Sequence, residues 1–381
     1  MLDDLHFFPG FCLLVVGLGL QFHLVRRFSE SYRRQGLVLA AIAVSTVLLS
    51  LGYFLEFNQV SRHLPAWWAT WLQCASIVET MSLIGISIAL PFLQWRTTER
   101  APRFQPARRN FLQTAGASLC VAPVAATAFG IVTRNRFQVS EVHIPVPNLP
   151  KDLDGLKIVQ LSDIHLSAFL SERELARAID MANETRAQIA LVTGDLITRH
   201  GDPLDACLGQ LARLRADAGV LGCLGNHEIY TESEVYVTAQ GRRLGIEFLR
   251  HEARGLRFGG AAINIAGVDY QRKHSRYLKG AEKLIAPGAL NILLSHNPDV
   301  FPVAAAQGFD VTIAGHTHGG QIDFELLHQH MNVARYFTPY VRGLYHEGKS
   351  FVYVSSGLGT IGVPVRIGAP PEISLLRLCA T

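Results

Sequence analysis

Five short motifs of carboxylate, amide and imidazole residues constrain the fold of this chain most, because each follows directly on a brief apolar run. The runs are rich in Val, Ile and Leu, and Gly, Asp or Asn follow them closely, which is typical of buried strands. In an open α/β sheet, functional side chains gather at the carboxyl ends of the strands. We therefore expect all five motifs at one site. They are SDIH at 162–165, GD at 194–195, GNHE at 225–228, SH at 295–296 and GHTH at 315–318.

From about Gln138 onward, seven such runs alternate with turns and helical stretches. Residues 172–185 carry Leu175, Ile179 and Ala182 on one helical face, between the first two runs. This alternation is typical of an α/β domain, which we assign to residues 155–381, with residues 134–154 as a connector that includes a first strand. The predicted strands are residues 156–161, 189–193, 219–224, 263–268, 291–295, 311–314 and 351–355.

The first 133 residues differ in composition from the rest. They carry ten arginines, no lysine and six acidic residues, whereas the remainder has equal numbers of cations and acids. Four stretches are almost free of charged residues, and each approaches the roughly 20 apolar residues that cross a bilayer. We predict an all-α transmembrane region of about four helices over residues 1–133. The stretches are residues 5–25, 36–55, 66–95 and 110–133.

Loop arginines predict the orientation of this region. They cluster at residues 26–34 and 96–109, whereas the loop between the second and third stretches has only Arg62. Positive loops stay in the cytoplasm, so the α/β domain is expected outside. The pair Arg108 and Arg109 resembles a twin-arginine export signal or serves as a plain anchor on the inner side. Both interpretations place the α/β domain outside. Glu79 lies inside the third stretch, and three interpretations of it are open. It is functional, it pairs with a polar residue of another helix, or it lies near an interface and stays hydrated.

Spacing within the motifs indicates how metal ions would be held. Asp163 and His165 are two residues apart, so in extended backbone their side chains leave the same face. His316 and His318 repeat this spacing. Asp195 follows a glycine at a strand end, where its carboxylate can bridge two ions roughly 3.5–4 Å apart. Imidazole together with carboxylate favours Mn, Fe or Zn over an all-oxygen magnesium site.

Taken in order, the motifs DxH, GD, GNH(D/E), H and GHxH resemble the calcineurin-like metallophosphoesterase superfamily over roughly residues 155–378. The resemblance implies a four-layer α/β/β/α sandwich of two mixed sheets, with residues 155–381 as the catalytic domain. Three segments resemble its bacterial membrane-associated or twin-arginine-exported branch, which includes phosphodiesterases and lipid-sugar pyrophosphatases. These segments are LLSHNPD at 293–299, GHTHGGQI at 315–322 and SSGLGTIGVPVRIGAPPEI at 355–373.

The resemblance also implies roles for single residues. His227 would face the substrate, with Glu228 positioning it, and Asn226 completes the expected catalytic set. A hydroxide bridging two divalent ions would attack phosphorus in line, and a protonated His227 would donate to the leaving oxygen. The expected ligands are Asp163, His165, Asp195 and His318 for the first ion, and Asp195, Asn226, His296 and His316 for the second.

The chain is thus predicted to be a membrane-anchored phosphoesterase acting on mono- or diesters of envelope lipids or polymers, at the periplasmic or extracellular side of a bacterial inner membrane. A pyrophosphatase for lipid-linked nucleotide sugars of the UDP-diacylglucosamine type is an alternative, and would need a cytoplasmic domain. A non-catalytic receptor or transporter is another. Residues 134–381 are electrically neutral and have no basic stripe with interleaved aromatics, so no nucleic-acid partner is expected. CLGNHE at 223–228 lacks the arginine of the LRGNHE form of protein Ser/Thr phosphatases.

Overall fold

The computed structural model describes residues 106–272, 276–326 and 329–381, together with short helical pieces between residues 15 and 88. It divides into two compact units. The first contains Met1–Val132 and Gly362–Val365, and the second contains Thr133–Ile361 and Arg366–Thr381.

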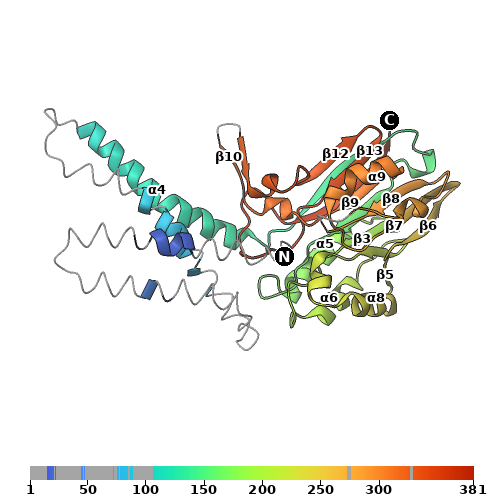
Figure 1. Cartoon of the computed structure of the whole chain (residues 1–381), viewed down its shortest axis with the longest axis horizontal. Helices are drawn as coiled ribbons and strands as arrows, with labels where there is room; N and C mark the ends of the chain where they lie inside the picture. The colour runs from blue at the N-terminus through green and yellow to red at the C-terminus, as the bar shows by residue number, and fades with distance from the viewer. Residues whose placement is uncertain are drawn as a thin grey trace. The chain divides into compact units, whose positions relative to one another are not determined.

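In the first unit, the helix α4 (Pro106–Thr133) covers the fourth predicted membrane stretch (Figure 1). Within the described part of the chain, no helix combines the length and the apolar character that a membrane crossing requires. The other three predicted stretches lie mostly outside the described residues. The transmembrane assignment of residues 1–133 therefore stays a prediction. The hydroxyl of Ser45 donates to the carboxylate of Glu79, which agrees with the polar-partner interpretation of this acid.

The second unit contains two six-stranded mixed sheets. The first has the order β1-β14-β2-β3-β4-β5. Its strands β2 to β5 are mutually parallel, whereas β14 runs antiparallel to β2 and parallel to the edge strand β1. The bounds are β1 (Gln138–Val146), β2 (Lys157–Leu161), β3 (Ile189–Thr193), β4 (Val220–Cys223), β5 (Ile246–Phe248) and β14 (Glu372–Ala380).

The second sheet has the order β12-β13-β9-β8-β7-β6. The four inner strands are parallel, and both edge strands pair antiparallel with their neighbours. A separate hairpin joins β10 (Asp323–Leu326) to β11 (Gln329–Asn332). The strands of the sheet are β6 (Glu252–Phe258), β7 (Ala261–Gly267), β8 (Leu290–Leu294), β9 (Val311–Ala314), β12 (Gly343–Glu347) and β13 (Ser350–Val354).

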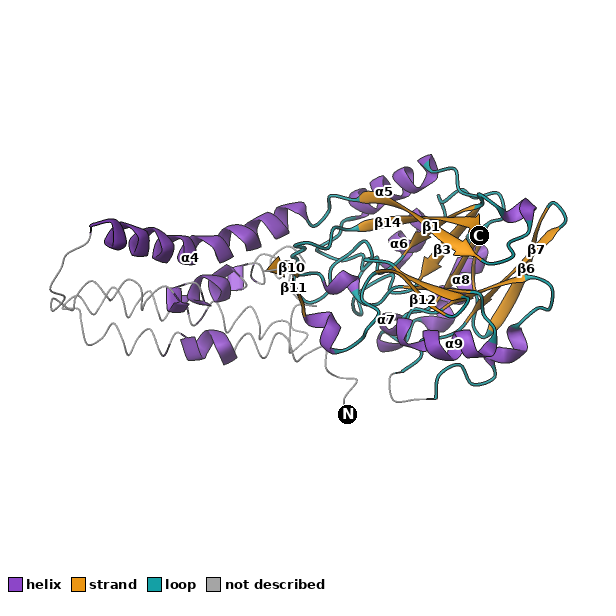
Figure 2. Ribbon diagram, turned by 90° about the horizontal axis from the view of Figure 1, so that it is seen from above, coloured by secondary structure: helices purple, strands orange, loops and turns teal. Residues whose placement is uncertain are grey.

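Helices cover the outer face of each sheet. Ser171 and Glu174 form a capping box that begins α5, whose buried face includes Leu175 and Ile179 and packs on the first sheet. On the other side, Phe301 of α9 packs against the second sheet. Figure 2 shows α5 and α9 on opposite sides of the strands. The helices are α5 (Glu172–Glu184), α6 (Leu204–Leu211), α7 (Asn226–Tyr230), α8 (Glu234–Arg243) and α9 (Phe301–Gln307).

One hydrophobic core lies between the two sheets. Ile158 and Leu191 of the first sheet are fully buried against Ile265, Ile292 and Ile313 of the second. Each such side chain contributes about 1.5–3 kcal/mol by leaving water. Helix, sheet, sheet and helix thus stack as four layers, and the predicted architecture of two mixed sheets with helices outside is confirmed.

Candidate metal centre

The five motifs lie at the carboxyl ends of strands from both sheets. β2, β3 and β4 supply the first three motifs, and β8 and β9 supply the last two. Backbone hydrogen bonds join neighbouring motifs, from Asp163 N to Gly194 O at 3.1 Å and from Gly315 N to His296 O at 3.1 Å. Parallel strands place their carboxyl ends at the same edge, so residues far apart in sequence meet there.

Three residues predicted for the first ion lie together. Asp163, His165 and His318 each offer one ligand atom, and these atoms lie within 4.8 Å of one another. His318 Nε2 is 3.5 Å from Asp163 Oδ1, and the rings of His165 and His318 stack with centroids 4.9 Å apart. All three side chains are buried. This part of the chain can therefore hold a cation away from bulk water.

A second group lies beside the first. Asp195, His296 and His316 also have ligand atoms within 4.8 Å of one another. His296 Nε2 lies 3.0 Å from Asp195 Oδ2, and that oxygen is also 3.5 Å from His165 Nε2. The carboxylate of Asp195 thus contacts both groups, as a bridging ligand must. Asn226, buried at the first residue of α7, directly precedes His227, whose backbone N–H donates to Asp195 Oδ1.

Two buried polar atoms indicate that this donor set fits cations. Oδ1 of Asn226 and Nδ1 of His318 have no hydrogen-bond partner among the described residues. Leaving such a buried group unsatisfied costs about 1–3 kcal/mol. A divalent cation would provide the missing partner, because amide oxygen, carboxylate and imidazole are all ligands of such ions.

Two backbone carbonyls fix the orientation of two imidazoles. Nδ1 of His296 lies 2.6 Å from Thr193 O, and Nδ1 of His227 lies 2.6 Å from Thr198 O. A carbonyl oxygen only accepts, so Nδ1 carries a proton in both rings. The Nε2 atom of each ring is consequently the one left for chemistry, in the arrangement common to metal-binding histidines.

Five of the seven predicted ligands have left-handed backbone. Positive φ is uncommon outside glycine, and such strain costs of order 1–3 kcal/mol per residue. It persists only where the surrounding structure enforces it, and here it concentrates on the motif residues. The φ angles are 49° at Asp163, 46° at His165, 56° at Asp195, 74° at His316 and 53° at His318.

Glycines pack directly against the two carboxylates. A Cβ added at Gly225 would lie 2.1 Å from Asp195 Oδ1, and one at Gly315 would lie 2.4 Å from Asp163 Oδ2. Both distances are far shorter than van der Waals contact. Only glycine therefore fits at these two positions while the carboxylates keep their place.

The metal-free site concentrates opposite charges. Burial alone would raise the pKa of Asp195, but His296 and His227 outweigh it and hold that pKa well below its usual range. Burial raises the pKa of Asp163 to about 6, with a further contribution from Asp195. Burial would lower the pKa of His296, yet Asp195 and Asp163 raise it to about 10. At neutral pH, His296 thus carries a proton that balances the carboxylates.

The resemblance assigns Glu228 to position His227, and that role stays a prediction. Nδ1 of His227 itself lies 2.6 Å from the carbonyl oxygen of Thr198. The buried carboxylate of Glu228 accepts hydrogen bonds from the backbone N–H groups of Asp195, Leu196 and Gly225, at 2.7–2.9 Å. Glu228 therefore fixes the loops that present the ligands.

Several neighbours of the site were not predicted. The ring of Tyr270 lies 5.4 Å from that of His316, and Tyr230 lies 5.4 Å from His227. Thr198 contacts two imidazoles, His227 through its backbone carbonyl and His165 through its hydroxyl at 3.2 Å. Arg366 stands in the glycine-rich segment 355–373, where a single arginine among apolar residues could have indicated a buried cation.

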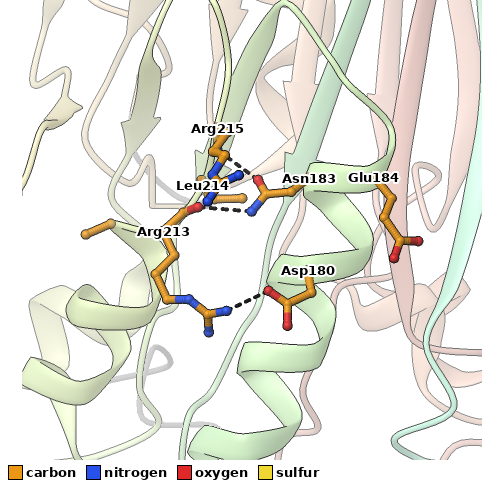
Figure 3. A pocket seen from close by; sticks show the side chains of 7 residues that line it. Asp180, Asn183, Glu184, Arg213, Leu214 and Arg215 are labelled. Atoms are coloured by element: carbon orange, nitrogen blue, oxygen red, sulfur yellow. Dashed lines mark hydrogen bonds and ion pairs between the residues drawn. The ribbon is translucent and has the colours of Figure 1, made fainter.

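A pocket away from the motifs lies between α5 and the segment after α6 (Figure 3). Arg213 contacts Asp180 at 2.6 Å, and Asn183 bonds the backbone of Arg213 and Arg215. These polar groups satisfy one another, and none is a predicted ligand. We assign the pocket no role.

Known proteins are similar to this chain over the part that carries the five motifs. The model of the calcineurin-like phosphoesterase family matches residues 156–320. A Bos taurus transmembrane protein with metallophosphoesterase domain is 31% identical over 319 residues, covering 78% of this chain and 69% of the relative. An uncharacterised metallophosphoesterase of Bacillus subtilis is 30% identical, and the match covers 72% of this chain and 98% of the relative. One of Campylobacter jejuni is 33% identical, covering 63% of both proteins.

Fold, clustered ligand residues and relatives together define a metal-dependent phosphoester hydrolase. The chain belongs to the calcineurin-like phosphoesterase family, as the motifs predict. Relatives from Bos taurus and Danio rerio are named as transmembrane proteins.

Proposed function

We propose that this chain is a dinuclear phosphoesterase, anchored in a bacterial inner membrane, that hydrolyses phosphate esters of envelope lipids or polymers on the outer side. The observation that carries the hydrolytic part is the contact of one carboxylate, Asp195, with histidines of both groups. Its Oδ2 lies 3.0 Å from His296 and 3.5 Å from His165. The first ion would be held by Asp163, His165, Asp195 and His318, and the second by Asp195, Asn226, His296 and His316.

Bound divalent ions would supply a water of lowered pKa and neutralise charge on the phosphoryl oxygens. The protein's own residues do the rest. Glu228 and the glycines keep the carboxylates in place, and His227 would donate a proton to the leaving oxygen. Its ring is set by Thr198 O and packs edge-on against Tyr230 and His165, at 5.4 and 4.7 Å.

An exposed apolar segment supports a lipid-phase substrate. Val333, Tyr336 and Phe337 are 66%, 89% and 62% exposed, on and just after the short helix η7 (Val333–Tyr336). Asn332 holds this segment to the site, because its side chain donates to Gly319 O at 3.0 Å, next to His318. Aromatic residues flanked by arginine, here Arg335, favour the headgroup region of a bilayer. The membrane proposal also draws on the uncharged stretches of residues 1–133.

The test is hydrolysis by the purified full chain, loaded in turn with Mn²⁺, Fe²⁺ and Zn²⁺. Substrates are a nitrophenyl monoester, a bis-nitrophenyl diester, a phospholipid phosphate ester in vesicles and a nucleotide-sugar pyrophosphate. We expect ester hydrolysis that Asp195→Asn abolishes. Hydrolysis of none by metal-loaded protein would contradict the enzymatic proposal, and hydrolysis of the pyrophosphate alone would replace it with a pyrophosphatase. A reporter fused to the C-terminus tests the side of the membrane.

A further inference from the structure

Arg366 is a buried cation behind the site. Its side chain is 2% exposed, and its guanidinium donates to five backbone carbonyls. Burying an arginine is costly unless all its donors are satisfied. The acceptors are Gly359 O at 3.1 Å, His318 O at 3.4 Å, Ala369 O at 3.0 Å, Ser356 O at 2.8 Å and Gly357 O at 3.2 Å.

Three of these carbonyls belong to the loop 356–359, which wraps the ligands of the first ion. Gly359 N donates to Asp163 O at 2.7 Å, and a Cβ added at Gly359 would lie 2.9 Å from His165 Cβ. A Cβ added at Gly357 would lie 2.5 Å from Asp163 Cβ. The loop therefore touches Asp163 and His165 directly. Arg366 also bonds His318, so it reaches the backbone around three ligands of one ion.

The cation is balanced mainly by these carbonyl dipoles. Among the described residues, no carboxylate forms an ion pair with Arg366 within 4.0 Å. Glu372 approaches indirectly, since it accepts from Ser356 N at 3.0 Å and from the hydroxyl of Tyr353. Burial lowers the pKa of Arg366 to about 10, with Asp163 and Glu372 opposing that shift. The guanidinium thus stays charged at neutral pH and keeps all its donors.

The second ion site has supports of its own. His296 is oriented by Thr193 O, and Asn226 begins α7, whose capping carboxylate is Glu228. None of the five carbonyls belongs to a predicted ligand of the second ion. The contacts of Arg366 are therefore asymmetric between the two sites.

We propose that Arg366 is a positioning residue for the first ion, and that its loss weakens that site selectively while the second ion remains. The inference rests on the proposed ligand sets. A purely structural role would act on the whole domain and weaken both sites together. A positioning role acts first on Asp163, His165 and His318, the ligands that Arg366 and the loop 356–359 contact.

The experiment uses the metal-free full chain, titrated calorimetrically with Mn²⁺ and followed by electron paramagnetic resonance. The wild type should bind two ions and give the spectrum of a coupled pair. Arg366→Met should keep one ion within about threefold of wild-type affinity, weaken the other at least about tenfold, and give the six-line spectrum of an isolated ion. Arg366→Lys, which retains the charge but has fewer donors, should fall between them.

Arg342→Met is the matched control. This half-exposed arginine bonds Gly368 O and lies 3.2 Å from Asp323, without contacting the loop 356–359. It should keep both ions. Circular dichroism of the metal-free variants checks folding, and Arg366→Lys carries the test if Arg366→Met does not fold. Equal weakening of both ions, or of neither, would overturn the inference. A wild type that binds no pair of ions would instead contradict the proposed function itself.

Discussion

His296 Nε2 lies 3.0 Å from Asp195 Oδ2, although the two residues follow strands of different sheets. Asp195 follows β3 of the first sheet, and His296 follows β8 of the second. The contact exists only when the sheets are packed on each other. Metal binding at this pair should therefore be coupled to the folding of the whole domain.

Gly225→Ala should lower activity by about 10²-fold without unfolding the domain. The added Cβ would lie 2.1 Å from Asp195 Oδ1, so the carboxylate must move. A displacement of about 1 Å at a catalytic group costs about 10²-fold in rate, which steady-state kinetics would detect. Gly209→Ala is the control, because Gly209 lies in α6 with nothing within 4 Å of an added Cβ. Unchanged activity in Gly225→Ala would show that this carboxylate has no fixed place.

Glu228→Gln should destabilise the fold. The carboxylate of Glu228 accepts hydrogen bonds from three backbone N–H groups. The substitution places an amide NH₂ group against these donors. We expect a loss of about 2–4 kcal/mol in the free energy of unfolding, measured by denaturant titration of metal-free protein. Glu174→Gln, in the exposed capping box of α5, should cost only about 1 kcal/mol. Equal losses in the two variants would argue against the buried role of Glu228.

His227→Asn should slow the hydrolysis of esters by an amount that depends on their leaving group. In the proposed mechanism His227 protonates a leaving alkoxide, whereas nitrophenolate leaves without a proton. General acid catalysis contributes about 10²–10⁴-fold to a rate. The hydrolysis rate of alkyl esters should therefore fall at least about 10²-fold, and that of nitrophenyl esters much less. Tyr230→Phe keeps the ring beside His227 and should change neither rate greatly. An equal loss for both kinds of ester would contradict the proton-donor role.

Metal affinity should rise with pH. Below its pKa of about 10, metal-free His296 holds a proton that an ion must displace. Affinity should therefore increase by about tenfold per pH unit near neutrality, and more steeply below the pKa of Asp163 at about 6, where a second proton is lost. Calorimetry in buffers of different ionisation enthalpy would count the released protons. Binding without proton release at about pH 7 would contradict the charged state of His296.

The sequence predicted the strands that carry the motifs, because their residues are buried on both faces and form continuous apolar runs. Residues 189–193 and 311–314 match β3 and β9 in full. The edge strand β6 was missed for the opposite reason. β6 is largely exposed along its length, so it shows neither an apolar run nor a clear alternation.

The candidate site was likewise predicted only in part. The candidate ligands were predicted from their type and spacing, and the structure brings Asp163, His165 and His318 together. The backbone groups that orient them could not be predicted, because the carbonyls of Thr193 and Thr198 that contact His296 and His227 leave no signal in residue type. The contacts of Arg366 with its loop arise from tertiary packing alone.

The most direct test of the account is a diffraction experiment on crystals grown with Mn²⁺, recorded at a wavelength where manganese scatters anomalously. We predict two peaks, one beside Asp163, His165 and His318, the other beside Asn226, His296 and His316, with Asp195 contacting both. A single peak, or a peak pair that Asp195 does not bridge, would contradict the dinuclear site.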